Sequence, residues 1–178
     1  MKNVFAINGS ASQHSANQKL LDYLAVLTKD YFNLTVFNGL KTLPHFDPEL
    51  SIHDTPKSIL EFRQQIENAD GVLICTPEYV FSIPSGLKNV IEWCVSTTVF
   101  SDKPIGLITA SAHGEKGHEE LQLILKTIMT KFTPDTSLLI QGIKGKINEH
   151  GDITDNPTKE DLKKFVDAFK NLIQNNIQ

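Results

Sequence analysis

The stretch GVLICT at residues 71–76 is short and almost wholly apolar. A run of this kind is typical of a strand that is buried on both faces of a parallel sheet. The stretch VFAI at residues 4–7 has the same character and ends in a Gly/Ser turn. Three further strands are predicted at residues 34–37, 104–110 and 136–141. Together these runs predict the strands of one sheet.

Apolar residues at helical spacing fill the intervals between these strands. In the clearest case, Leu87, Val90, Ile91 and Cys94 fall at positions i, i+3, i+4 and i+7. Helices are predicted through residues 20–27, 59–69, 87–94, 121–132 and 162–173. The alternation of strands and helices predicts an α/β fold, with a parallel sheet covered by helices on both faces.

Five strands in a doubly wound sheet favour the order 2-1-3-4-5 within a three-layer αβα sandwich. The 178 residues fit a single domain that covers residues 1–178. Ligands of this architecture lie outside the carboxyl ends of the strands, at the switch between the first and third strands. The loops after Ile7, Thr76 and Ala110 are therefore the places where function is expected.

The composition is that of an ordinary globular protein, with 40% hydrophobic and 21% charged residues and a net charge of −4. Lysine and arginine are scattered, so we expect no nucleic-acid partner. No run approaches the ~20 apolar residues of a membrane span, and the N-terminal run is too short for a signal peptide. We therefore expect no membrane contact and a cytoplasmic location. Cys75 and Cys94 are predicted to be reduced core thiols.

The first loop reads GSASQHSAN at residues 9–17 and directly precedes a helix. Amides at a helix N-terminus lack internal partners and carry partial positive charge, so they bind phosphate without a basic residue. The hydroxyls of Ser10, Ser12 and Ser15 strengthen that prediction. The alternative, that Ser15 is a helix N-cap and the other residues fill a turn, stays open. Neither GxGxxG nor a P-loop is present, which argues against a Rossmann dinucleotide fold and against a nucleoside triphosphatase.

The second loop begins TPEYVFSIPSGLKN at residues 76–89. A proline-containing turn exposes backbone N–H and C=O groups that can read the polar edge of a flat ring such as a flavin. Tyr79 and Phe81 offer apolar surface for the ring itself. The alternative is a helix-entry loop with an exposed aromatic pair.

The third loop reads TASAHGEKGH at residues 109–118. Gly114 and Gly117 would let the backbone approach a ligand closely, and nearby N–H groups could stabilise the negative charge of a reduced flavin. His113 is a candidate acid, with a water-exposed loop histidine as the alternative. Lys116 and His118 are predicted to be solvated.

At these loops the sequence resembles the NADPH-dependent FMN reductase family, a flavodoxin-like group that includes quinone, azo-dye and chromate reductases. The first loop matches the family pattern at Gly9, Ser10, Ser15 and Asn17. The second loop matches at Thr76, Pro77, Glu78, Tyr79, Ser82, Pro84, Leu87, Lys88, Asn89, Ile91 and Trp93. Four positions depart from the pattern: Ser12 for arginine, Val80 for asparagine, Ser85 for glycine and Glu92 for aspartate. The third loop resembles a shortened form of the family's segment.

The resemblance implies bound FMN, with its phosphate at the first loop and its ring at the other two. The expected phosphate contacts are Ser10, Ser12, Ser15, Ala16 and Asn17. The expected ring contacts are Pro77, Glu78, Tyr79, Val80, Phe81, Ser111, His113 and Gly114. It also implies a homodimer, often a dimer of dimers forming a tetramer, with the flavin near the interface. The missing arginine leaves the choice between NADPH and NADH open, and Val80 and Phe81 make the mouth of the pocket more apolar.

We expect a ping-pong oxidoreductase, in which a reduced nicotinamide donates hydride and leaves before a small acceptor takes its place. The acceptor could be a quinone, an azo compound, a free flavin or a metal oxyanion. No catalytic side chain is required, because the cofactor carries the chemistry. The six histidines show no metal-binding spacing, and GxSxG is absent. Two alternatives stay open: a non-enzymatic FMN electron carrier, and a flavin-binding redox sensor.

Overall fold

A computed structural model describes residues 1–12 and 14–176 and shows a three-layer sandwich around one parallel sheet. The strand order is β2-β1-β3-β4-β5, which confirms the predicted fold class and order. The strands are β1 (Lys2–Asn8), β2 (Phe32–Phe37), β3 (Gly71–Thr76), β4 (Ile105–Ser111) and β5 (Ser137–Gln141).

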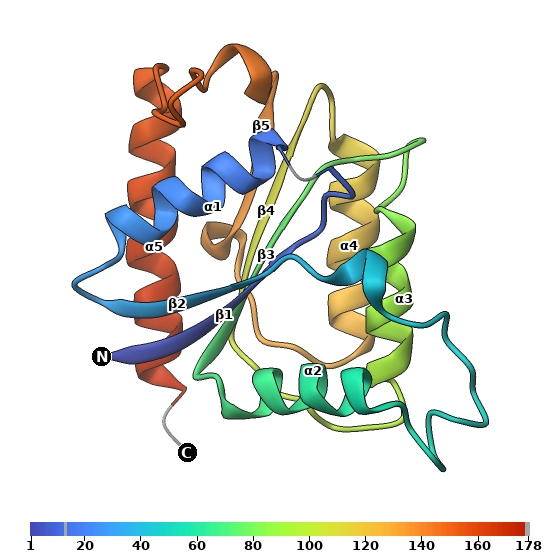
Figure 1. Cartoon of the computed structure of the whole chain (residues 1–178). Helices are drawn as coiled ribbons and strands as arrows, with labels where there is room; N and C mark the ends of the chain where they lie inside the picture. The colour runs from blue at the N-terminus through green and yellow to red at the C-terminus, as the bar shows by residue number, and fades with distance from the viewer. Residues whose placement is uncertain (13, 177–178) are drawn as a thin grey trace.

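Helices cover both faces of the sheet (Figure 1). One face carries α1 (Ala16–Leu27) and α5 (Asn156–Asn175). The other carries α2 (Lys57–Asn68), α3 (Ser85–Cys94) and α4 (Glu115–Thr127). Short 3₁₀ turns are η1 (Leu40–Thr42), η2 (Pro134–Thr136) and η3 (Ile143–Gly145). Within the described residues, no helix joins the length and the apolar character that crossing a bilayer requires.

Alternate side chains of each central strand enter opposite halves of the core, as the period of two in a strand dictates. In β3, Leu73 and Cys75 pack in the half beneath α1 and α5. Val72 and Ile74 pack in the half beneath α2, α3 and α4. All of these side chains are buried, which is why the strand reads as a continuous apolar run rather than an alternating one.

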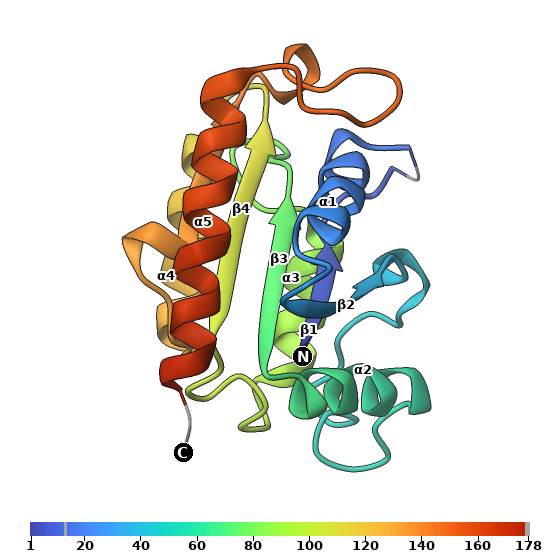
Figure 2. The ribbon, with the colours of Figure 1, turned by 90° about the vertical axis from the view of Figure 1, so that its left-hand side faces the viewer.

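The parallel strands bring their carboxyl ends to one edge of the sheet, at the top in Figure 2. Because β1 pairs with both β2 and β3, the chain leaves β1 toward one face and β3 toward the other. The loops after β1, β3 and β4 therefore meet at the edge where the topology places a ligand.

Helix α4 begins and ends earlier than the predicted 121–132. The amide of Met129 donates to the carbonyl of Lys126, and the amide of Thr130 donates to the carbonyl of Leu125, both at 3.1 Å. These two bonds form a Schellman motif, with Met129 in the left-handed conformation (φ 59°) that glycine usually supplies. Phe132 still packs against the core, but from the segment beyond the helix.

Cys75 and Cys94 are buried free thiols, as predicted. Burial raises the pKa of Cys94 to about 12, against a smaller opposing effect of Arg63, and raises the pKa of Cys75 further. The thiol of Cys75 donates to the side-chain oxygen of Asn17 at 3.3 Å, which ties β3 to α1. Both thiols therefore stay protonated and act as core residues.

Candidate functional site at the carboxyl edge of the sheet

A cavity of about 510 Å³ opens where the first, second and third loops meet. We call it the carboxyl-edge cavity. Its lining residues are Ser10, Ser12, His14, Ser15, Ala16, Asn17, Lys19, Pro77, Glu78, Tyr79, Ala110, Ser111, Ala112, Lys144 and Ile147. This volume lies within the ~300–1,000 Å³ range of cofactor sites.

The first loop lies directly against the end of β3. The amide of Gly9 donates to the carbonyl of Cys75 at 2.8 Å. A Cβ atom at Gly9 would collide with the hydroxyl oxygen of Thr76. Glycine is therefore required here to bring the loop close to the neighbouring strand.

The N-terminal turn of α1 forms one wall of the cavity through Ser15, Ala16 and Asn17. Ser15 is the N-cap, and its hydroxyl accepts from the amide of Gln18 at 3.0 Å. The amides that open a helix have no intrahelical partners, and they lie at the positive end of its dipole. The cap and the anion site, posed as alternatives from the sequence, are therefore compatible.

The side chain of Asn17 is buried and occupied within the protein. Its amide nitrogen donates to the carbonyl of Ala110 at 3.1 Å, and its oxygen accepts from the thiol of Cys75. These contacts tie α1 to the ends of β3 and β4. The backbone N–H of Asn17, at the start of the helix, is thus the group that it offers to an anion.

The second loop contains a tight turn from Tyr79 to Ser82. The amide of each of these two residues donates to the carbonyl of the other, at 2.9 and 3.0 Å. Between them, Val80 and Phe81 have φ values of 52° and 58°. Left-handed conformations cost on the order of 1–3 kcal/mol each for residues with side chains of this size. The turn therefore depends on its surroundings to keep its shape.

Tyr79 joins the first and second loops. Its hydroxyl lies 3.3 Å from the hydroxyl oxygen of Ser10, and its ring lines the cavity while remaining 39% exposed. Pro77 lies beside it in the lining, and Ala110 and Ala112 add apolar surface. Serine hydroxyls and helix amides thus lie in the same cavity as an aromatic and apolar wall, which fits a phosphate joined to a flat ring.

The carboxylate of Glu78 turns toward the third loop. It accepts from the amide of Gly114 at 3.3 Å and from the amide of Gly117 at 2.9 Å, at the start of α4. Two of the N–H groups expected to face a reduced flavin are therefore occupied by this carboxylate. Gly114 (φ 88°) is the N-cap of α4, and its left-handed backbone conformation requires glycine.

Nine of the thirteen predicted cofactor residues lie together in the cavity lining. They are Ser10, Ser12, Ser15, Ala16, Asn17, Pro77, Glu78, Tyr79 and Ser111. Four others lie outside the lining of this single chain. Val80 and Phe81 are 95% and 74% exposed, His113 is exposed, and Gly114 is buried within the third loop.

Six lining residues were not predicted: His14, Lys19, Ala110, Ala112, Lys144 and Ile147. Lys144 and Ile147 follow β5, whose carboxyl end lies at the same edge of the sheet. The rule that ligands lie outside the carboxyl ends of the strands therefore also applies to the loop after β5. Lys19 donates to the carbonyls of Asn148 and Glu149, both at 3.2 Å, and so fastens α1 to that loop.

The prediction that His118 is solvated is wrong. Only 9% of it is exposed, and Nδ1 lies 2.8 Å from the hydroxyl oxygen of Thr109. Nε2 lies 3.1 Å from the hydroxyl oxygen of Ser137 and 3.2 Å from the side-chain nitrogen of Gln122. Burial lowers the pKa of His118, with a smaller opposing effect of Glu119. His118 is therefore a neutral residue that packs α4 against β4 and β5.

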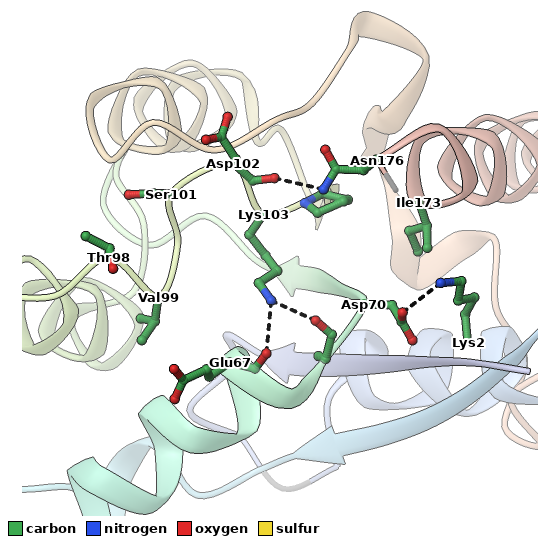
Figure 3. Close-up of a pocket in the computed structure, with 12 residues that line it drawn as sticks. Lys2, Glu67, Asp70, Thr98, Val99, Ser101, Asp102, Lys103, Ile173 and Asn176 are labelled. Carbon is green, nitrogen blue, oxygen red and sulfur yellow. Dashed lines mark hydrogen bonds and ion pairs between the residues drawn. The ribbon is translucent and has the colours of Figure 1, made fainter. Parts of the chain in front are cut away.

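A second cavity, of about 420 Å³, lies at the opposite edge of the sheet (Figure 3). We call it the amino-edge cavity. Its lining residues are Lys2, Glu67, Ala69, Asp70, Thr98, Val99, Ser101, Asp102, Lys103, Pro104, Ile173 and Asn176. Lys2 pairs with Asp70 at 2.8 Å. Lys103 donates to the carbonyls of Glu67 and Ala69, at 3.3 and 2.7 Å.

Among the described residues, no three His, Cys, Asp or Glu side chains lie together as a metal site would require. The charges near the carboxyl-edge cavity favour an anion instead. Lys19 and Lys144 contribute positive charge, and the carboxylate of Glu78 is held by backbone amides. The cavity can therefore hold an anionic, flat-ringed ligand without a metal ion.

Comparisons with known proteins point to one family. Residues 2–144 match the family model described as NADPH-dependent FMN reductase. The chain is 29% identical to the NADH:(hydroxy)cinnamate reductase subunit CrdA of Vibrio ruber, over 94% of this chain and 85% of that protein. It is 27% identical to a quinone reductase of Escherichia coli K12, over 96% and 95% of the two chains. The solved structure of FerB, a flavoenzyme NAD(P)H:(acceptor) oxidoreductase from Paracoccus denitrificans, superimposes with a TM-score of 0.83 at 28% identity, covering 99% of each chain.

Proposed function

Because the chain belongs to the NADPH-dependent FMN reductase family, we propose that it binds FMN in the carboxyl-edge cavity and passes electrons from a nicotinamide to a small acceptor. Membership makes the protein an FMN-dependent NAD(P)H oxidoreductase; the position of the cofactor and the nature of the acceptor are our proposal. The observation that carries it is the cavity itself, which the first turn of α1 lines together with Pro77 and Tyr79.

Each wall of the cavity has a task in this proposal. The amides of Ala16 and Asn17 and the hydroxyls of Ser10 and Ser12 would hold the phosphate. Tyr79 and Pro77 would support the ring. Bound FMN would supply the redox chemistry, accepting a hydride and passing on electrons. The protein contributes position, because holding donor and ring in contact is the main catalytic requirement.

We propose a quinone as the acceptor. The curated relatives include proteins named as quinone reductases, and the exposed Val80 and Phe81 lie in the loop beside the ring site. A planar apolar acceptor suits such surroundings better than a hydrated oxyanion does. Free flavin, azo compounds and chromate are the other acceptors to assay beside it.

We also propose a homodimer in the cytoplasm. Val80 and Phe81 leave large apolar side chains exposed at the tip of the second loop, where a second copy could cover them. The reduced, buried thiols suit a reducing compartment. Light scattering on a gel-filtration column tests the assembly: a monomer at micromolar concentration would contradict it.

The deciding experiment is an anaerobic visible spectrum of the purified protein, before and after addition of NADPH or NADH. We expect flavin absorption that either nicotinamide bleaches and that a quinone restores. A spectrum without flavin, and no uptake of added FMN, would contradict the proposal. Flavin that only a protein partner can reduce would identify an electron carrier, and slow reduction by both nicotinamides would favour a redox sensor.

The place of the ring is tested by Tyr79→Ala, with Lys116→Ala as its control. Lys116 is exposed on α4 and pairs with Glu119 at 2.7 Å, away from the cavity lining. We expect Tyr79→Ala to weaken FMN retention more than Lys116→Ala does. Equal flavin content in the two purified variants would contradict the placement.

A further inference from the structure

Helix α4 holds the second loop at two points. At its N-terminus, the amides of Gly114 and Gly117 bond to the carboxylate of Glu78. One turn further along, a single carboxylate oxygen of Glu120 accepts from the hydroxyl of Ser82 at 2.5 Å and from the amide of Ile83 at 3.0 Å. Glu78 and Ser82 bracket the turn that contains Tyr79, so the helix fixes both ends of it.

The turn between these two points is strained, although the reciprocal backbone bonds of Tyr79 and Ser82 close it. Val80 and Phe81 are both in the left-handed region, and neither is buried. An exposed turn with strained residues relaxes unless neighbouring contacts hold it. The contact of Tyr79 with Ser10, at 3.3 Å, is a long hydrogen bond and a weak restraint.

We propose that Glu120 is a positioning residue for the flavin ring. By holding Ser82 and Ile83 against α4, it fixes the turn so that Tyr79 and Pro77 present a preformed surface to the ring. Charge-assisted hydrogen bonds to a carboxylate are the stronger kind, which suits a residue that must resist backbone strain. This inference rests on the proposed function, because it assumes that a flavin ring lies on Tyr79.

The neighbouring Glu119 supplies a matched control. It lies on the same helix, exposed, and pairs with Lys116 at 2.7 Å. Glu119→Ala removes the same charge from the same helix without touching the second loop. A loss of flavin affinity caused by charge alone would appear in both variants, whereas a loss caused by the turn would appear in Glu120→Ala alone.

The experiment measures the dissociation constants of FMN and riboflavin for the apoprotein and its variants by flavin fluorescence, at a temperature where circular dichroism shows each to be folded. We expect Glu120→Ala to weaken the binding of both flavins by the same factor, roughly 5- to 30-fold, because both bonds that hold the turn to α4 at Ser82 and Ile83 are lost. Glu120→Gln keeps an oxygen acceptor and should restore affinity to within about threefold of the wild type. Glu119→Ala should bind both flavins as the wild type does.

Riboflavin separates this role from a merely structural one, because it lacks the phosphate. A loss confined to FMN would place the effect at the first loop and overturn the proposal, as would unchanged binding of both flavins by Glu120→Ala. If the wild type binds neither flavin, the proposed function itself fails, which is a different result from an insensitive Glu120.

Ser82→Ala gives a second route if Glu120→Ala does not fold. It removes the hydroxyl donor to Glu120 and leaves the amide bond of Ile83, so we expect a smaller loss for both flavins, roughly 2- to 5-fold. Where Glu120→Ala folds, the double variant with Ser82→Ala and Glu120→Ala should lose less affinity than the product of the two single losses, because both changes act on one contact. Independent losses, or no loss in Ser82→Ala, would overturn the proposal.

Discussion

The two edges of the sheet carry cavities of similar size, about 510 and 420 Å³, with opposite chemistry. At the amino edge, Lys103 bonds to two carbonyls and Lys2 pairs with Asp70. At the carboxyl edge, the helix α1 begins with amides that the helix itself leaves free. The first cavity has its charges matched by the protein, and the second presents donors to whatever enters it.

The difference follows from the direction of the strands. A parallel sheet gathers the loops that precede its helices at one edge, so helix N-termini collect there. The opposite edge gathers helix C-termini, whose carbonyls attract lysine side chains, as the C-terminal carbonyls of α2 attract Lys103. Cavity volume alone therefore does not identify a binding site in this fold. Polar groups without a partner in their own helix, such as the first amides of α1, do.

The largest effect is expected from Gly9→Ala. The new Cβ would collide with Thr76 and displace the first loop. We expect the binding free energy of FMN to weaken by about 1–3 kcal/mol, which is roughly 5- to 150-fold in affinity. Fluorescence titration of the apoprotein with FMN measures it.

Gly71→Ala is the matched change at the other edge. There a Cβ would meet the flexible end of Ile173 at 2.8 Å. We expect some loss of thermal stability and an unchanged FMN dissociation constant for the folded protein. A weakening of FMN by Gly71→Ala equal to that by Gly9→Ala would break the distinction between the two edges.

The next largest effect is expected from Lys103→Met, and it should concern stability rather than flavin. Removal of the ammonium group leaves the carbonyls of Glu67 and Ala69 without this donor, and because both contacts are at least partly open to water the cost is about 0.5–1.5 kcal/mol in the free energy of unfolding. Urea denaturation measures the loss. Altered hydride transfer from NADPH in the folded variant would show that the amino edge takes part in function after all.

Ser15→Ala should have an effect no larger than that of Lys103→Met, on both the stability of the protein and its affinity for FMN. Loss of the cap to the amide of Gln18 costs about 1 kcal/mol of stability, the usual value for an N-cap. It also removes a hydroxyl from the cavity wall where we propose that the phosphate binds, so FMN affinity should fall while riboflavin affinity changes little. An equal loss for FMN and riboflavin would contradict the placement of the phosphate.

Much of this architecture could be predicted from the sequence, because its signals are local. The buried runs at 4–7 and 71–76 predict strands, and the switch-point rule then selects the edge. The end of α4 could not be predicted, since Met129 occupies a position where glycine would have marked the Schellman motif. A methionine there gives no signal, and the apolar spacing continues past it to Phe132.

The loops that meet at the site could be predicted better than the direction of individual side chains. Glu78 lines the cavity, and nothing in the sequence indicates that its carboxylate also holds the start of α4. No pattern in the sequence pointed to Glu120, because it lies on α4 just beyond the third loop and reaches the second loop only through the packing of that helix. Contacts of this kind depend on how helices pack on the sheet, and residue spacing along the chain does not encode that packing.

The smallest expected effect is on the pH dependence of stability, which differs between the two edges. Burial lowers the pKa of both His118, near the carboxyl edge, and Lys103, at the amino edge. For each base, the unfolded chain takes up its proton at a higher pH than the folded chain does, so stability falls as the pH falls through the window between the two pKa values. For His118 that window begins near the ordinary value of about 6.5 and extends downward, whereas for Lys103 it begins near 10.4. Denaturation of the wild type and of His118→Gln from pH 7.5 to 5 isolates the histidine, because Lys103 is present in both proteins and its contribution cancels in the comparison. The wild type should lose more stability than His118→Gln on acidification, and equal slopes would show that His118 is protonated as easily when folded as when unfolded.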